Sequence, residues 1–168
     1  MNFLKGILVL LLATILSCGK QRSPMQSTAV TEEEMMARRT HELVNAHRSA
    51  LRLPPLLWNE TVAEQAVKHS RDMASGRVPL GHEGFEERFQ AISTVLSAQA
   101  GGENVAYNYG FNDPSQAAVN GWLNSPGHRA NIEGEYTLTG LGCARDVKGG
   151  WYFTQIFILT FKSVALEH

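Results

Sequence analysis

The sequence predicts an α+β domain, a three-layer α-β-α sandwich around a small central antiparallel sheet. Helical patterns come first and recur between extended segments, whereas two β-rich runs, 136–144 and 151–161, cluster near the end. The linker between them, 145–150, is turn-like, which predicts an antiparallel hairpin. Alternate residues of the second run are largely apolar on both sides, as expected of a strand that is covered on both faces.

The first part of the chain predicts export and lipid attachment. Residues 1–17 contain Lys5 and an apolar run that is shorter than the ~20 residues a spanning helix needs. The run closes on Ser17-Cys18, which resembles a bacterial lipobox, so we expect a lipoprotein signal peptide and a lipid on Cys18 as the membrane anchor. An ordinary secretory signal with a coincidental cysteine is the alternative. Gly19 is not acidic, which favours the outer membrane or cell surface over inner-membrane retention.

The remaining chain is expected to form a flexible tether, 18–30, and one domain, 31–168. The formal net charge of the 168 residues is −1, and it becomes about −2 once Lys5 is removed with the leader. A slightly negative charge argues against nucleic-acid binding, which relies on an excess of basic residues. With Cys18 lipidated, Cys143 has no partner for a disulfide, so the apolar core has to hold the fold.

The first predicted helix begins at Thr31, with acidic residues in its first turn where the helix dipole favours them. It has to end before Pro54, because proline disfavours a helical conformation in the residue before it. His47 lies on or beside the apolar stripe and is expected to be a half-buried structural histidine. The stripe consists of Met36, Leu43, Val44, His47, Ala50 and Leu51.

Asn59 is predicted to cap a second helix that stops at Gly76. The inward face of this helix is rich in alanine, so another element can approach it closely. His69 lies off that face and is expected to be solvated. Apolar spacing over 85–92 predicts a third, short helix.

Alternation over 103–108 predicts a strand, or an extended segment, that opens with the carboxylate of Glu103. A plainer alternative is that Glu103 only caps or pairs with an arginine. Asp113 and Pro114 supply the cap and first residue of another helix, which runs to Trp122.

The next turn carries the central hypothesis about function. Ser125 is predicted as an N-cap and Pro126 as the first helical residue, which places His128 in the first turn. The positive end of the helix dipole favours a neutral imidazole there, and a neutral imidazole can accept a proton or bind a metal. We expect His128 to converge with His82 and Glu103 on one pocket, although a single loop histidine such as His82 is by itself weak evidence.

Several segments in this order resemble one known family. They are Leu43-Val44-Asn45-Ala46-His47-Arg48, Pro55-Leu56-Leu57-Trp58-Asn59, Gly81-His82, Gly102-Glu103-Asn104-Val105-Ala106, Trp122-Leu123-Asn124-Ser125-Pro126-Gly127-His128-Arg129-Ala130-Asn131-Ile132 and Tyr152-Phe153-Thr154-Gln155. Over roughly residues 33–161 the chain resembles the bacterial form of the CAP superfamily, also called the SCP-like domain (cysteine-rich secretory, antigen 5, pathogenesis-related 1). The resemblance implies an α-β-α sandwich.

The resemblance also implies a cleft with two histidines and two glutamates. His82, Glu103 and His128 match three of these residues, and the second glutamate falls on Ser125, which removes one carboxylate. The family histidines bind zinc, so the resemblance implies His82 and His128 as zinc ligands. Two imidazoles and one carboxylate would suffice for an open zinc site with bound water.

The sequence shows no convincing catalytic triad. Ser125 is explained as a helix cap, and Cys143 falls in a predicted strand, where a buried inert thiol is common. Three classes of function stay open. The favoured one is a lipid-anchored, non-enzymatic module whose cleft binds zinc and a small ligand or protein partner. The second is a metal-assisted hydrolase such as a peptidase, and the third is a sterol- or fatty-acid-binding protein, a role that some family members have.

Overall fold

The computed structural model describes residues 30–161, so the predicted signal peptide, Cys18 and most of the predicted tether lie outside the described residues. In order, the elements are α1 (Glu32–Ala50), β1 (Leu57–Trp58), α2 (Glu60–Ala74), α3 (Phe85–Ser93), β2 (Ala98–Asn108), α4 (Pro114–Leu123), α5 (Pro126–Glu133), β3 (Leu138–Arg145) and β4 (Trp151–Thr160). Within residues 30–161, no helix is both long and apolar enough to cross a membrane.

The strands form one sheet in the order β1-β3-β4-β2. The predicted hairpin is confirmed, because β3 and β4 pair antiparallel from Leu138↔Ile158 to Arg145↔Trp151. The sheet as a whole is mixed and not purely antiparallel, since β1 pairs with β3 in parallel. This short strand precedes α2 directly, and its two residues carried too little pattern to be predicted from the sequence.

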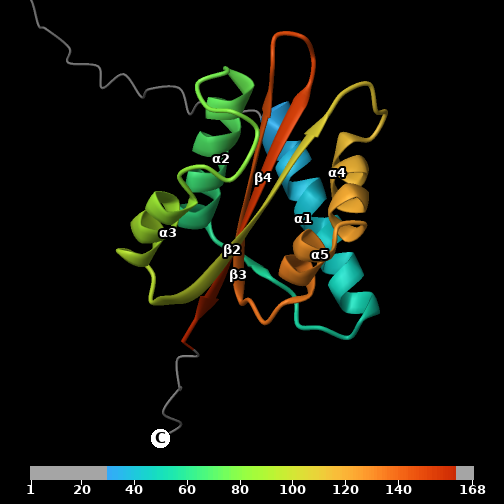
Figure 1. Ribbon diagram of the computed structural model, residues 1–168. Helices are drawn as coiled ribbons and strands as arrows, with labels where there is room; N and C mark the ends of the chain where they lie inside the picture. The colour runs from blue at the N-terminus through green and yellow to red at the C-terminus, as the bar shows by residue number, and fades with distance from the viewer. Residues whose placement is uncertain (1–29, 162–168) are drawn as a thin grey trace, which may run out of the picture.

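Helices cover both faces of the sheet, which confirms the predicted three layers (Figure 1). One layer holds α2 and α3, and the other holds α1, α4 and α5. Alternate side chains of β4 pack into the two layers. Phe153 and Phe157 join the larger core with Trp122, whereas Ile156 and Ile158 join a smaller core beneath α2 and α3. Both faces of β4 are therefore dry, as its apolar pattern predicts.

Two glycines let α2 lie directly on β3. A Cβ atom on Gly140 would come within 2.1 Å of the Ala63 nitrogen, and one on Gly142 within 2.2 Å of the Val67 nitrogen. The alanine-rich face of α2 supplies the other half of this close approach, as the sequence indicates. The side chains of Leu141 and Cys143 point the other way, into the core against α1.

The helix starts agree with the predicted caps. The Thr31 hydroxyl accepts from the Glu34 amide at 3.1 Å, Asn59 accepts from the Val62 amide at 3.2 Å, and Asp113 accepts from the Gln116 amide at 3.1 Å. Ser125 stands at the N-cap position of α5, but its side chain makes no capping hydrogen bond.

The predicted buried stripe of α1 is wrong at its last turn. Ala50 and Leu51 are exposed, whereas Arg48 is 1 % exposed and lies inside. The Arg48 guanidinium donates to the carbonyls of Pro54, Ile132 and Gly134, so its burial is compensated by hydrogen bonds. His47 is half-buried, as predicted, and its Nε2 lies 2.9 Å from Glu133 Oε1.

Candidate functional site

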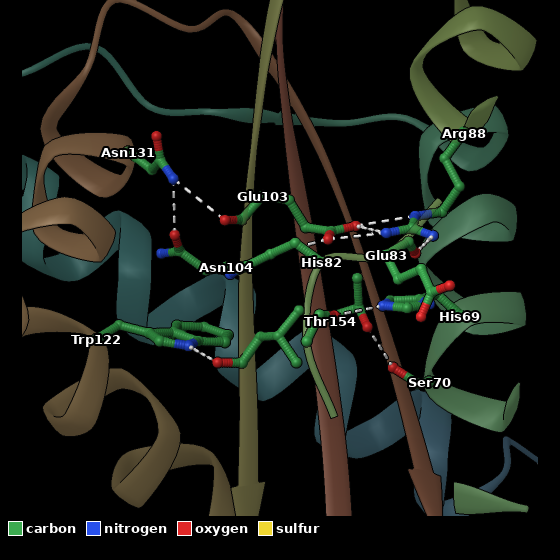
Figure 2. A network of polar contacts seen from close by, with 12 residues as sticks. His69, Ser70, His82, Glu83, Arg88, Glu103, Asn104, Trp122, Asn131 and Thr154 are labelled. Atoms are coloured by element: carbon green, nitrogen blue, oxygen red, sulfur yellow. Dashed lines mark hydrogen bonds and ion pairs between the residues drawn. The ribbon is translucent and has the colours of Figure 1, made fainter. Parts of the chain in front are cut away.

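The candidate site is built around β2, the edge strand at the opposite end of the sheet from β1. Because no further strand follows β2, side chains from both helical layers can reach around it. Figure 2 shows Asn131 on one side of the strand and Arg88 and His69 on the other, with Glu103 between them. Glu103 itself is 6 % exposed and belongs to β2.

Arg88 of α3 takes both oxygens of the Glu103 carboxylate. Its Nε donates to Oε2 and its Nη2 donates to Oε1, each at 2.9 Å (Figure 2). The third nitrogen, Nη1, donates to the carbonyl of Glu83 in the loop that carries His82. Glu103 is therefore paired with an arginine, and the bidentate pair also fixes the His82 loop to the strand.

His82 lies against the same carboxylate and faces solvent. Its Nδ1 is 3.1 Å from Glu103 Oε1, and its side chain is 51 % exposed. A carboxylate paired with arginine can only accept a hydrogen bond, so Nδ1 carries the hydrogen. In the neutral ring, Nε2 is then the nitrogen left available to accept a proton or bind a metal.

His128 comes to this site from the other helical layer, in the first turn of α5. The ring centres of His82 and His128 are 6.0 Å apart, with an interplanar angle of 49°. Burial lowers the pKa of His128, and the charge of His82 lowers it further. The direction agrees with the predicted neutral imidazole, and the structure brings His82, Glu103 and His128 together.

Two asparagines tie α5 to β2 and so set the position of His128. Asn131 Nδ2 donates to the Glu103 carbonyl at 3.2 Å and to Asn104 Oδ1 at 2.9 Å (Figure 2). Asn104 Nδ2 in turn donates to the His128 carbonyl at 3.0 Å. Gly102 leaves room for this contact, because a Cβ there would lie 2.7 Å from Asn131 Oδ1.

The predicted solvation of His69 is wrong. His69 is 3 % exposed, and its Nε2 donates to the Gly81 carbonyl at 2.9 Å, directly beside His82. Burial lowers its pKa, so the neutral ring is favoured. The reason for the error is tertiary: the loop after α2 folds back over the helix and covers a position that the helical pattern alone leaves outside.

Arg88, Asn104 and Asn131 were not assigned a role from the sequence. A signal for Arg88 exists, because it lies three residues after Phe85 and four before Ile92, on the inward stripe of α3. An arginine on such a stripe needs a buried partner. Asn104 and Asn131 lie within the segments that carry the family resemblance, but their pairing depends on how α5 docks on β2.

The spacing of His82 and His128 suits two ligands of one zinc ion. With zinc–nitrogen bonds of ~2.0–2.1 Å, two imidazole rings sharing one ion have centres roughly 5 to 6 Å apart, so the 6.0 Å between His82 and His128 fits two ligands. Glu103 is held by Arg88 instead of being free. Within residues 30–161, no group of three or more histidine, cysteine or acidic side chains is arranged to hold a metal. Water would complete the coordination.

The two potential nucleophiles do not join the histidines. Cys143 is buried, pairs with no cysteine within residues 30–161, and burial raises the pKa of its thiol well above the ordinary value. This agrees with the predicted inert thiol. Ser125 forms no hydrogen bond with a histidine within the described chain, so no serine or cysteine triad is assembled there.

Comparison with known proteins agrees with this fold. The model of the CAP family, described as the cysteine-rich secretory protein family, matches residues 41–157. The membrane protein YlbC of Bacillus subtilis is 38 % identical over 122 residues, which cover 70 % of this chain and 32 % of YlbC. YkwD of the same organism is 34 % identical over 121 residues, covering 70 % of this chain and 44 % of YkwD. The chain therefore spans less than half the length of these relatives.

Solved structures give the same result. An extracellular protein containing an SCP domain from Bacillus anthracis superposes with a TM-score of 0.63 at 32 % identity, over 76 % of this chain and 41 % of that one. An outer surface protein of Borrelia burgdorferi superposes with a TM-score of 0.63 at 20 % identity, over 73 % of this chain and 91 % of that one. The second likeness concerns the fold alone.

Proposed function

This chain belongs to the CAP family of cysteine-rich secretory proteins, and we propose that it is an extracytoplasmic, lipid-anchored member whose His82–His128 cleft binds a divalent metal ion, zinc in the first place, without catalysis. A small ligand or a protein partner would dock at the same cleft.

The main support for this proposal is that both carboxylate oxygens of Glu103 are paired with Arg88. A general acid or base has to exchange protons with a substrate, but both oxygens of this carboxylate accept from one guanidinium. Ser125 stands where a second glutamate would otherwise be available. The cleft then offers two imidazoles and no free carboxylate, which suits binding better than hydrolysis.

Glu103 has a clear part in a binding site of this kind. A metal-binding histidine usually donates its second ring nitrogen to a carboxylate or carbonyl, which fixes the ring and makes the free nitrogen a better ligand. The 3.1 Å contact from His82 Nδ1 to Glu103 supplies such a support. Zinc, when bound, would give the cleft a Lewis-acidic contact for an oxygen or nitrogen atom of a partner.

The metal is tested by calorimetric zinc titration of the full chain and three variants. We expect His82→Ala and His128→Ala each to weaken binding about tenfold or more, because each removes one of two protein ligands. His47→Gln is the matched control, since it removes an imidazole that contacts Glu133 and keeps a hydrogen-bonding side chain. Equal affinity of all four proteins would refute zinc binding at this cleft.

Anchoring is a separate part of the proposal. The predicted lipobox supports it, and the similar Bacillus anthracis protein is extracellular. In a bacterial host fed an alkyne-tagged fatty acid, we expect the label on the wild-type chain and in the membrane fraction, and neither after Cys18→Ala. Unchanged labelling of that variant would remove Cys18 as the acceptor.

One observation favours a hydrolase as the second candidate. Because burial lowers the pKa of His128, its ring is neutral near pH 7 and able to accept a proton from water. The decisive measurement is hydrolysis of a peptide library by the wild-type chain and by His128→Ala. Cleavage by the wild type that disappears in the variant would establish the hydrolase in place of the non-catalytic module.

A further inference from the structure

At the other edge of the sheet, part of β3 has no strand beside it on its outer side. β1 covers β3 only at Leu138 and Thr139, and β3 then continues to Arg145 as the outermost strand in the described part of the chain. The chain turns away there because Asn59 ends β1 and caps α2. Six residues of β3 therefore have a sheet neighbour on one side only.

The hydrogen bonds of β1 show which groups face this edge. The Leu57 amide donates to the Thr137 carbonyl at 3.0 Å, and the Asn59 amide donates to the Thr139 carbonyl at 2.9 Å. Backbone groups of a strand alternate in direction, so the amides and carbonyls of Leu141 and Cys143 point to the same side. No backbone group of residues 30–161 pairs with them on that side.

A cleft of about 510 Å³ lies along this edge, with Leu141 and Cys143 among its lining residues. These two residues are only 1 % and 2 % exposed, so a ligand has to part the cleft walls to reach their backbone groups. Its walls are α1 and α2, which lie on opposite faces of the sheet (Figure 1). Small side chains flank the strand, Ala37 from α1 and Ala63 and Val67 from α2. Trp58, the last residue of β1, lines the same cleft.

Exposed ion pairs link the two walls around the edge. Arg38 of α1 reaches Glu60 at 2.8 Å, and Arg71 of α2 reaches Glu33 at 3.9 Å. The side chains of both pairs are 37–71 % exposed, and exposed ion pairs contribute little to stability. They can open for a ligand at small cost, and they leave charges of both signs on the rim.

We propose that this cleft, the β3-edge cleft, binds an extended peptide segment that adds a strand beside Leu141 and Cys143. A peptide main chain offers donors and acceptors in the same alternating order as these unpaired groups, and strand addition to a free edge is a recurring mode of peptide recognition. A purely apolar ligand would leave the same nearly buried amides and carbonyls without partners, which is unfavourable for a buried polar group.

The pleat of the added strand fixes where its side chains go. Alternate side chains would point toward α1 and toward α2, because these helices flank opposite faces of the sheet. Each wall carries charges of both signs: α1 contributes Glu33, Glu34 and Arg38, and α2 contributes Glu60, Glu64, Lys68 and Arg71. We therefore expect the main chain of the peptide, and not its net charge, to determine the affinity. This cleft is separate from the His82–His128 site and does not depend on its function.

The first test is amide hydrogen exchange of the full chain without any ligand, read residue by residue by NMR. We expect the amides of Leu141 and Cys143 to exchange faster than those of Gly140, Gly142 and Ala144, which face β4. Equal protection of odd and even residues would mean that the edge is already paired, and the proposal would fall. Protection that appears only as the protein concentration rises would assign the edge to a second copy of the chain and would also overturn it.

The second test selects short peptides from a random displayed library on the immobilised full chain. We expect a selected peptide to slow exchange at Leu141 and Cys143 but not at Gly142. Methylating alternate main-chain nitrogens of that peptide should weaken binding about tenfold or more in one register and little in the other, since one register faces β3. If every selected peptide leaves these two amides unprotected, or if both registers behave alike, the proposal is wrong.

A matched pair of variants locates the binding on the protein. Val67→Trp fills the cleft from α2 and is expected to weaken the same peptide about tenfold or more. Gln65→Trp, on the same helix, faces a different hollow and is expected to leave the affinity unchanged. Equal affinity for both variants would place the peptide elsewhere, and the methylated peptides keep the proposal testable if Val67→Trp fails to fold.

Discussion

The buried pair between Arg88 and Glu103 makes a strong prediction about stability. The Glu103 side chain is 2 % exposed and the Arg88 side chain 10 % exposed, and three hydrogen bonds of 2.9 Å leave the guanidinium. Removing one partner of such a pair leaves an uncompensated buried charge. We expect Arg88→Met to lower the free energy of unfolding by about 3–5 kcal/mol.

The sign of a second substitution separates this explanation from simple loss of packing. Adding Glu103→Met to Arg88→Met removes the orphaned charge, so the double variant should be more stable than Arg88→Met by about 2 kcal/mol. Urea unfolding at pH 7, followed by tryptophan fluorescence and circular dichroism, measures both differences. The reasoning is refuted if Glu103→Met lowers the stability of the Arg88→Met protein further.

An exposed pair provides the control for that experiment. Arg71 and Glu33 are 3.9 Å apart, and their side chains are 62 % and 37 % exposed. We expect Arg71→Met to change the free energy of unfolding by less than about 1 kcal/mol. A loss as large as that of Arg88→Met would show that burial is not what distinguishes the two pairs.

Three further predictions concern close packing, acid sensitivity and the α5 contact. Gly140→Ala should lower the free energy of unfolding by about 3 kcal/mol or more, because its Cβ would collide with the α2 backbone. Gly121→Ala has nothing within 4 Å of the added Cβ and should raise the free energy of unfolding by up to about 1 kcal/mol through better helix propensity in α4. Chemical denaturation measures both, and equal effects would contradict the packing argument. Burial lowers the pKa of His69 in the folded state, so its contribution to stability is complete above the unfolded pKa of ~6.5 and is lost as pH falls through the folded value. The free energy of unfolding should therefore fall less between pH 7 and pH 5 for His69→Gln than for the wild type. An equal fall in both proteins would exclude this residue as the cause. Asn131→Leu should lower the free energy of unfolding by about 1–3 kcal/mol by leaving two acceptors of β2 unpaired, and a change within measurement error would show that Asn131 does not hold α5.

Much of the fold follows from signals that act over three or four residues. Thr31, Asn59 and Asp113 each cap a helix with a bond to an amide three residues ahead, so the chain carries these helix starts locally. The apolar alternation of 151–160 likewise specifies a strand that is buried on both faces. The turn that begins α5 suggests the grouping of His82, Glu103 and His128, and the family resemblance implies the same three residues. The structure brings them together.

The sequence by itself determined where the helices and the longer strands form, because capping, proline placement and apolar periodicity depend on near neighbours in the chain. Tertiary structure decided the rest: that Arg48 and His69 are inside, that Glu103 is held by Arg88, and that β1 joins the sheet in parallel. Each of these depends on a carbonyl, a carboxylate or a strand edge that a distant segment supplies. Whether a polar side chain is buried is settled by the partner that meets it there, and local pattern does not encode that partner.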